Sequence, residues 1–149
     1  MEHSHLIKNC ARIMRRTQIH MDAVLAPYDL SSGSYPYLLE LSREDDINLE
    51  QISRRLAVDK AMSTRTIQRL EALDYLTKEP DPTDSRAFRL RLTSKARKSI
   101  PEIRYELDQW IARITEGLSE TDKNTVEMLL IRIEKNTDTI QNSRKDSSL

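Results

Sequence analysis

Residues 81–96, DPTDSRAFRLRLTSKA, change character within a short distance. They begin with proline and aspartate, which favour a turn. Apolar and basic side chains then alternate, as in a strand with one buried and one exposed face. With the preceding residues 74–80, DYLTKEP, the stretch predicts a β-hairpin whose outer face carries arginines. The apolar positions are Phe88, Leu90 and Leu92, and the basic positions between them are Arg89 and Arg91.

Two short helices are predicted immediately before this hairpin. Asn48 and Gln51 have the spacing of a capping box, which starts a helix of about two turns. Asp59 is placed to cap a second helix, from Lys60 to about Leu73. A connection of three or four residues between two such helices is typical of a helix-turn-helix. Residues 43–48, REDDIN, read as a polar turn before the pair.

Longer helical patterns lie at both ends of the chain. Apolar residues recur at steps of three and four from Leu6 to Val24, and again beyond Thr93, where the hairpin ends. The predicted fold is mainly α: a winged helix-turn-helix with a small β-hairpin wing, flanked by N- and C-terminal dimerisation helices. We expect a single domain over residues 1–149, with the winged region at 34–93 and dimerisation helices at about 4–30 and 95–140. A chain of this length could hardly bury every apolar stripe, which predicts packing against a second copy.

Composition excludes several classes of protein. The 149 residues include 32% charged residues and only two glycines, which favours a helix-rich chain. No apolar run approaches the roughly 20 residues of a membrane span, and no signal peptide is evident, so a cytoplasmic protein is expected. We predict no metal site and no cofactor, because His3, His5 and His20 lack a ligand pattern.

Charge is distributed unevenly along the chain. The formal net charge is zero, but Gln51–Arg104 contains thirteen basic and seven acidic residues, a local charge of +6. The remainder of the chain therefore carries −6. A basic middle between acidic flanks indicates an anionic partner that meets only the middle.

The order and spacing of these features resemble the MarR family of bacterial transcriptional regulators. The hairpin matches the family's wing pattern D-x-R-x-x-x-L-x-L-T from Asp84 to Thr93, and residues 58–76, VDKAMSTRTIQRLEALDYL, resemble its recognition helix. The resemblance implies a homodimeric repressor bound to double-stranded DNA at a pseudo-palindromic operator. Each subunit would place one helix in the major groove and one wing in the minor groove. Release by a small aromatic or phenolic effector is also implied.

Two departures from the family pattern concern this helix. Asp74 stands where the family commonly has glycine, but aspartate tolerates a left-handed backbone better than most residues. Met62 and Ser63 stand where relatives carry a threonine followed by an apolar residue. The usual inward and outward roles are therefore expected to be exchanged.

The residues expected to contact DNA lie on the helices and at the wing tip. Guanidinium can pair with guanine and an amide with adenine, so Arg65 and Gln68 are the candidates for base edges. Lys60 and Arg69 are expected to contact phosphates, beside Thr64 on the same face. On the preceding helix, Ser53 and Arg54 are further candidates for backbone contacts. The full set is Ser53, Arg54, Lys60, Thr64, Arg65, Gln68, Arg69, Asp84 and Arg86.

At the wing tip, Arg86 is expected to enter the narrow minor groove, where the potential is strongly negative. Asp84 cannot favour DNA by its charge. It is expected to orient the tip, either by holding the Arg86 guanidinium or by accepting hydrogen bonds from the turn backbone. For Arg89 and Arg91, exposed strand positions and phosphate contacts remain equal alternatives.

Other functions are weighed against this one. A winged helix that binds a protein partner is the main alternative, and the basic helix face argues against it. Cys10, with Tyr35 and Tyr37 as nearby tyrosines, raises a redox-sensing alternative, although its apolar helix position predicts a buried thiol. Trp110 is expected in the core rather than in a cofactor site. No nucleophile and base arrangement is present, so an enzyme is not expected.

Overall fold

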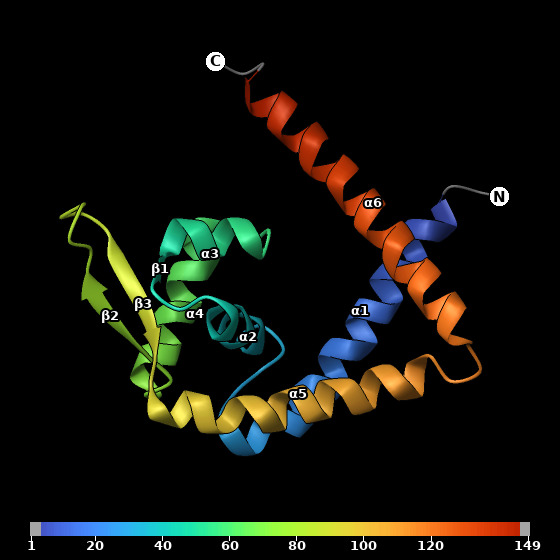
Figure 1. Ribbon diagram of the computed structural model, residues 1–149, viewed down its shortest axis with the longest axis horizontal. Helices are drawn as coiled ribbons and strands as arrows, with labels where there is room; N and C mark the ends of the chain where they lie inside the picture. The colour runs from blue at the N-terminus through green and yellow to red at the C-terminus, as the bar shows by residue number, and fades with distance from the viewer. Residues whose placement is uncertain (1–3, 147–149) are drawn as a thin grey trace. The chain divides into compact units, whose positions relative to one another are not determined.

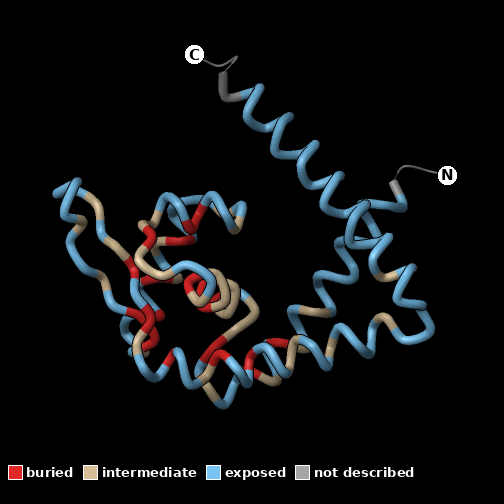
Figure 2. Tube along the Cα trace, in the orientation of Figure 1, coloured by how far each residue is buried: buried red, intermediate tan, exposed pale blue. Residues whose placement is uncertain are grey.

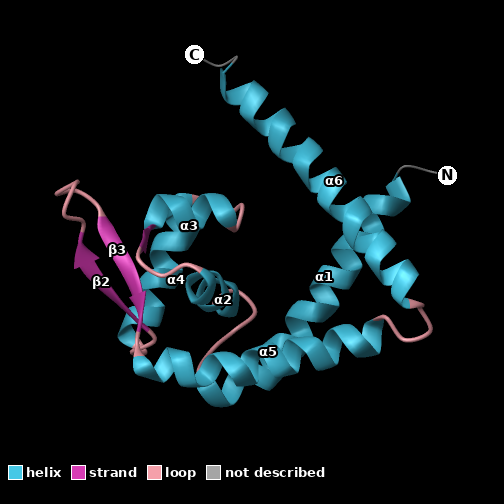
Figure 3. Ribbon diagram, in the orientation of Figure 1, coloured by secondary structure: helices cyan, strands magenta, loops and turns pink. Residues whose placement is uncertain are grey.

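The computed structural model describes residues 4–146, which are mainly helical with a small antiparallel sheet (Figures 1 and 3). Described residues up to Trp110 form one compact unit, and those from Ile111 onward form a second. The predicted fold class, a winged helix-turn-helix between flanking helices, is confirmed. The elements are α1 Ser4–Leu25, η1 Ala26–Tyr28, α2 Tyr35–Arg43, β1 Ile47–Asn48, α3 Leu49–Arg55, α4 Lys60–Ala72, β2 Leu76–Pro80, β3 Phe88–Leu92, α5 Ser94–Ile114 and α6 Glu120–Asp146.

The helices of the winged region begin where their capping residues predict. Asn48 Oδ1 accepts the Gln51 backbone N–H and Gln51 Oε1 accepts the Asn48 backbone N–H, each at 2.9 Å, which completes the capping box of α3. Asp59 Oδ1 accepts the Met62 backbone N–H at 2.8 Å and so caps α4. Because each cap satisfies backbone donors that the first turn leaves unpaired, these two starts are determined locally.

The sheet contains a strand that the sequence did not reveal. Residues 43–48 were expected to form only a polar turn, yet Ile47 and Asn48 form β1 and pair with Leu90 and Arg89 of β3. In the described chain the strand order is β1-β3-β2, with antiparallel pairing throughout. A two-residue strand is too short to show alternation, so only its pairing with β3 defines it.

One core holds the winged region and the ends of two neighbouring helices (Figure 2). It joins the inner faces of α2, α3 and α4 to the sheet, to the C-terminal end of α1 and to the first half of α5. Within the helices, positions three and four apart supply the core side chains, as the apolar patterns predict. The buried residues are Met21, Leu25, Leu30, Tyr37, Leu38, Leu41, Ile47, Ile52, Ile67, Leu70, Tyr75, Leu76, Leu90, Leu92, Ala96, Ile100 and Ile103.

Phe88 departs from the strand pattern, because it was expected to be buried with the leucines of β3. It is 50% exposed, whereas Leu90 and Leu92 are buried. Phe88 pairs with Pro80 at the distal end of the hairpin, and the Lys78 ammonium lies 5.9 Å from its ring centroid. Its side chain therefore contributes to the surface of the wing rather than to the core.

The turn after α4 accommodates the departure at Asp74. This residue has φ 61°, in the left-handed region, and the next backbone N–H, that of Tyr75, donates to Leu70 O at 2.9 Å. Thr93 Oγ1 donates to Asp74 O at 2.7 Å and accepts the Ala96 N–H at 3.2 Å, so it joins this turn to the start of α5. Aspartate thus serves in the turn where relatives carry glycine.

The apolar side chains of the terminal helices are largely exposed in the single chain. On α1, Leu6 and Ile13 are 43% and 54% exposed, and only Met21 and Leu25 are buried. Cys10, expected to be buried, is exposed because the stripe it belongs to has no cover along this part of α1. On α6 the exposed large apolar residues are Val126, Met128, Leu129, Leu130, Ile131, Ile133 and Ile140.

Trp110 was expected in the core, but it is half-buried and lies outside the core residues named above. Its ring stacks on that of His20 with centroids 4.4 Å apart, and its Nε1 donates to Thr17 Oγ1 at 2.8 Å. These contacts hold α5 to α1 within the first unit.

Candidate nucleic-acid interface

Helix α4 presents two chemically different faces. Ser63, Ile67 and Leu70 are buried and recur at steps of four and three, so they define the inner face. The predicted DNA-contacting residues lie on the other sides of the helix. Of these, Lys60, Arg65, Gln68 and Arg69 are exposed, and Thr64 is half-buried with its hydroxyl donating to Lys60 O at 2.8 Å.

The expected exchange of roles at Met62 and Ser63 is present. Ser63 is fully buried, and its Oγ lies 3.0 Å from the phenolic oxygen of Tyr37, so the hydroxyl is satisfied inside the core. Met62 is 45% exposed and shares the outward stripe with Arg65 and Arg69, three and seven residues further on. An apolar group therefore stands on the outer face of the first turn of α4, a position that the motif alone did not mark as a contact.

The two candidates on α3 differ in exposure. Ser53 is 7% exposed and its Oγ donates to Leu49 O at 2.7 Å, so its hydroxyl is turned to its own helix and offers no exposed donor. Arg54 is exposed and lies 3.2 Å from Glu50, with both side chains 73% accessible. Such a solvated pair contributes little to stability, so Arg54 can exchange it for a phosphate at small cost.

The wing tip is shaped by two aspartates. Asp84 Oδ1 accepts the Arg86 backbone N–H at 2.9 Å. Of the two roles expected for Asp84, the structure therefore shows the hydrogen bond to the turn backbone rather than a contact with the Arg86 guanidinium. Asp81 Oδ1 accepts the backbone N–H and the hydroxyl of Thr83 at 2.8 and 2.7 Å. These hydrogen bonds, with a further one from Arg89, lower the pKa of Asp81 to about 2. Asp81 was not among the predicted site residues, because its role depends on partners in the folded turn.

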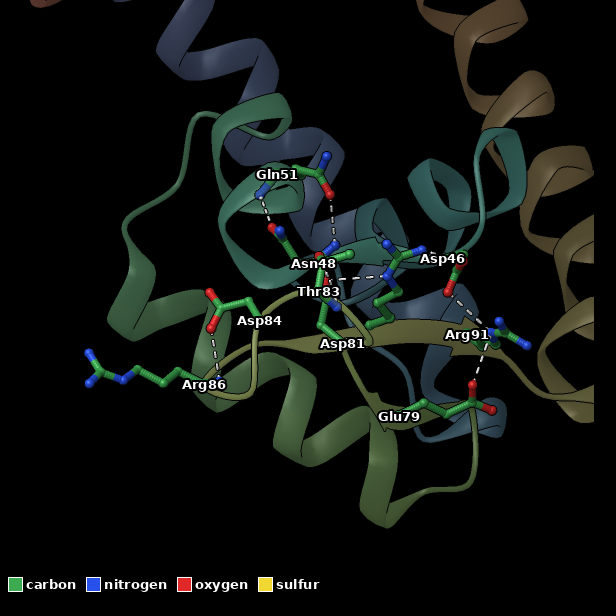
Figure 4. Close-up of polar contacts among 10 residues, drawn as sticks. Asp46, Asn48, Gln51, Glu79, Asp81, Thr83, Asp84, Arg86 and Arg91 are labelled. Atoms are coloured by element: carbon green, nitrogen blue, oxygen red, sulfur yellow. Dashed lines mark hydrogen bonds and ion pairs between the residues drawn. The ribbon is translucent and has the colours of Figure 1, made fainter.

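The guanidinium of Arg86 projects away from the hairpin (Figure 4). It makes no hydrogen bond or ion pair with any residue from 4 to 146. The side chain at the tip is therefore available to an external anion.

The other two wing arginines are engaged within the protein. Arg89 Nη1 lies 2.8 Å from Asp46, and its Nε lies 3.3 Å from Asp81. Arg91 Nε lies 3.2 Å from Asp46 and 3.3 Å from Glu79 (Figure 4). Hydrogen bonds from Arg89 and then Arg91 lower the pKa of the Asp46 carboxyl, and the pKa of each arginine is raised in turn. Of the two alternatives for these arginines, the geometry favours an internal role.

A groove separates α4 from the wing. It has a volume of about 390 Å³ and is bounded by the start of α3, one side of α4 and the tip and strands of the wing. It brings together four of the predicted residues, Lys60, Thr64, Asp84 and Arg86, which come from different elements. Arg65, Gln68 and Arg69 lie on α4 outside the lining, as do Ser53 and Arg54 on α3. The remaining lining residues are Asn48, Leu49, Glu50, Ile67, Lys78, Ala87, Phe88 and Leu90.

Other chemistries find little support in the described part of the chain. No group of three or more His, Cys, Asp or Glu side chains among residues 4–146 is placed to hold a metal ion. His3 lies outside the described residues. No described helix has the length and apolar character required to cross a bilayer.

Known proteins with similar sequences and folds identify the family. The profile of the MarR family matches residues 28–87. The HTH-type transcriptional regulator BilQ of Clostridioides difficile (strain CD3) is 34% identical over 119 residues, which cover 80% of this chain and 78% of that protein.

Solved structures agree. The MarR protein from Peptoclostridium difficile DA00132 superposes with a TM-score of 0.89 at 26% identity, covering 92% of this chain and 90% of that one. A MarR family transcriptional regulator from Listeria monocytogenes complexed with 26mer DNA has the same fold, with a TM-score of 0.84, 21% identity and 87% of each chain covered. Proteins of this family are regulators rather than enzymes. This chain therefore belongs to the MarR family of DNA-binding, winged helix-turn-helix transcriptional regulators.

Proposed function

We propose that this protein is a homodimeric repressor that binds a pseudo-palindromic operator and is released by a small aromatic effector. The observation that carries the proposal is the placement of exposed cations on both sides of one groove. Lys60 lines it from α4 and Arg86 from the wing tip, while Arg65 and Arg69 extend the exposed cationic face of α4. A helix and a thin hairpin that present cations in this way suit the major and minor grooves.

Within this arrangement each side chain takes the contact that its chemistry favours. Arg65 and Gln68 read base edges in the major groove, because guanidinium and amide groups can each make two hydrogen bonds to one base. Lys60, Arg69 and Arg54 hold phosphates, and Arg86 enters the minor groove. Asp84 fixes the tip through the Arg86 backbone N–H. To these we add Met62, whose exposed side chain suits contact with a thymine methyl group.

Dimerisation is proposed through residues of about 4–30 and 95–140. The exposed apolar side chains of α1 and α6 support it, since the largest apolar patch of a typical monomer is limited to a few hundred Å². A second copy of the chain supplies the cover that each helix lacks. Two-fold symmetry of the protein then requires two-fold symmetry of the operator.

Effector control follows as a shift between two conformations. A small aromatic molecule releases DNA only if it binds more tightly to the conformation in which the two α4 helices are wrongly spaced for the operator. Its binding must therefore weaken operator affinity, and the operator must weaken effector binding by the same factor.

The deciding experiment is the selection of binding sequences from random duplex DNA. The proposal expects enrichment of a pseudo-palindrome with half-sites about 10 base pairs, one helical turn, apart. Arg65→Ala/Arg69→Ala serves as the matched control, because both side chains are exposed and their removal leaves the core intact. Absence of enrichment at low salt would favour the protein-interaction alternative. Titration of an enriched complex with phenolic acids then tests release.

Dimerisation is tested separately on α6. Leu129→Lys places a charge at a position that is exposed in the single chain, so the fold of each subunit is retained while an apolar contact between copies is lost. Light scattering should report a dimer for the wild type and a monomer for the variant. The variant's operator affinity should be strongly reduced, because a monomer can contact only one half-site at a time. Thr139→Lys, at an exposed polar position of α6, is the control and should remain dimeric.

A further inference from the structure

Asp46 lies just before β1 and is attached to β3 by its backbone. Its φ of 68° places it in the left-handed region, and its N–H donates to Leu90 O at 3.0 Å. A left-handed aspartate is strained relative to glycine, and such strain persists only where the surroundings require it. The carboxylate of Asp46 reaches the outer face of β3, where the two strand arginines stand.

Each oxygen of the Asp46 carboxylate contacts a different arginine. Oδ2 lies 2.8 Å from Arg89 Nη1 and Oδ1 lies 3.2 Å from Arg91 Nε. The two arginines are two residues apart on the same face of β3, so without an intervening anion they repel each other. The side chains of Asp46 and Arg89 are 35% and 32% exposed, which places this bridge partly out of solvent.

From the bridge, further polar contacts continue to the wing tip (Figure 4). Arg89 Nε lies 3.3 Å from Asp81 Oδ2, and the other oxygen of Asp81 holds Thr83. The Asp81 side chain is only 8% exposed. The turn that contains Asp81 and Thr83 continues directly into the one that carries Arg86. A continuous set of hydrogen bonds therefore links the loop before β1 to the tip.

We propose that Asp46 is a positioning residue for the wing, which holds Arg89 and Arg91 within the protein so that Arg86 meets DNA from a fixed tip. This inference rests on the proposed DNA-binding function. A two-stranded hairpin is marginally stable in water by itself. If the hairpin is already fixed in the free protein, less conformational entropy is lost when it binds DNA. Neutralising Arg89 and Arg91 also restricts the wing's electrostatic contact with DNA to the tip.

The test uses Asp46→Asn, because asparagine has the same shape and also tolerates the left-handed region. Operator affinity is measured at several salt concentrations, with hydroxyl-radical footprinting of the minor groove, in the wild-type and Arg86→Ala backgrounds. We expect Asp46→Asn to lower affinity severalfold, to abolish minor-groove protection and to steepen the salt dependence, because the positive charge of Arg89 and Arg91 is then neutralised less completely. In the Arg86→Ala background it should cause no further loss of affinity, because it acts through Arg86.

Glu50→Gln is the matched control. It makes the same change of charge beside the proposed interface, but within residues 4–146 the one ion pair of Glu50 is with the exposed Arg54 on α3. It should leave minor-groove protection intact. A purely electrostatic effect of Asp46 would make the two variants behave alike, with tighter binding and full protection, and that outcome would overturn the proposal. So would additive losses from Asp46→Asn and Arg86→Ala.

Hydrogen exchange of the free protein separates this inference from the proposed function. Asp46→Asn should accelerate exchange in residues 81–88 while α4 remains protected, whether or not an operator is known. Unchanged exchange at the tip would refute the positioning role even if the wild type binds DNA. A wild type that binds no DNA would refute the proposed function, and the exchange result would still decide whether Asp46 orders the wing.

Discussion

Helix α4 and the wing are both proposed to contact DNA, but they are stabilised differently. In α4 the backbone is hydrogen-bonded internally, Asp59 caps the start, and the inner face is buried. Among the described residues, Arg65 and Arg69 have no side-chain partner. In the wing, Arg89 and Arg91 are both ion-paired. A helix packed on a core can present all its cations, whereas a hairpin uses some of its own to hold its shape.

Ion pairing within the protein also reduces the positive charge that residues 51–104 can offer to an external anion. The +6 of Gln51–Arg104 includes four arginines that each have at least one acidic partner outside that segment. Arg55 pairs with Glu40 and Glu44, Arg89 and Arg91 with Asp46, and Arg97 with Asp45. The acidic residues just before β1 therefore neutralise part of the basic middle. The proposed interface is therefore narrower than the local charge of the sequence suggests, and it centres on α4 and the wing tip.

The largest effect is expected on α4. Arg65→Ala should weaken binding to the selected operator by about 5- to 150-fold, since a bidentate arginine–guanine contact contributes roughly 1–3 kcal/mol. Binding to random DNA should fall much less, so specificity relaxes at one base pair. Competition binding against single-base operator variants measures this. Arg65→Lys is the control. Compared with Arg65→Ala it should regain the affinity that comes from attraction to phosphates, but not the preference for one base. Equal losses on operator and random DNA would assign Arg65 to a phosphate.

Within the wing, Arg86→Ala should weaken operator binding by about tenfold, because a hydrogen bond to a charged group contributes roughly 1.5 kcal/mol. The slope of log affinity against log salt should decrease in magnitude by about 1. Fluorescence anisotropy at four salt concentrations provides the slope. Arg91→Ala is the matched control, and its slope should equal that of the wild type because this arginine is engaged by Asp46 and Glu79. A smaller slope for Arg91→Ala would show that it contacts phosphate.

A smaller effect is expected at the first turn of α4. Replacing the thymine that contacts Met62 by uracil removes one methyl group and should weaken binding roughly fourfold, from about 0.8 kcal/mol per buried methyl(ene) group. Met62→Ala should bind both DNAs equally. Scanning each operator thymine in turn identifies the position. If no thymine shows sensitivity that depends on Met62, its side chain does not read a base.

The smallest effect concerns pH. The folded pKa of Asp81 is about 2, below its ordinary value of 3.8, so the carboxylate stabilises the wing tip above about pH 4. That contribution is lost as the pH falls towards 2. The backbone amide resonance of Thr83 should therefore shift with a midpoint near 2, and Asp81→Asn should remove the transition. A midpoint near 3.8 would mean that the hydrogen bonds to Thr83 do not hold in solution.

Much of the fold and part of the site were predictable because local chemistry decides them. Alternation over β3 and the capping residues of α3 and α4 placed the hairpin and helix-turn-helix correctly. The exposed cations of α4 follow from helical spacing against Ile67 and Leu70. Ser53 and Phe88 show where such patterns mislead: one predicted contact residue is buried, and one predicted anchor is exposed. Both depend on how far neighbouring elements extend over them.

The order of the main helices and the hairpin, the starts of α3 and α4, the exposed face of α4 and the family follow from the amino-acid sequence alone, because each rests on spacing within a few residues. Which wing arginines are available to an external anion depends instead on contacts between segments that are distant in the chain. Asp46 is more than forty residues from Arg89 in the chain, yet the two lie 2.8 Å apart once β1 pairs with β3. Charge pairing between distant segments depends on strand pairing, and the two-residue β1 leaves no periodic signal from which to infer it.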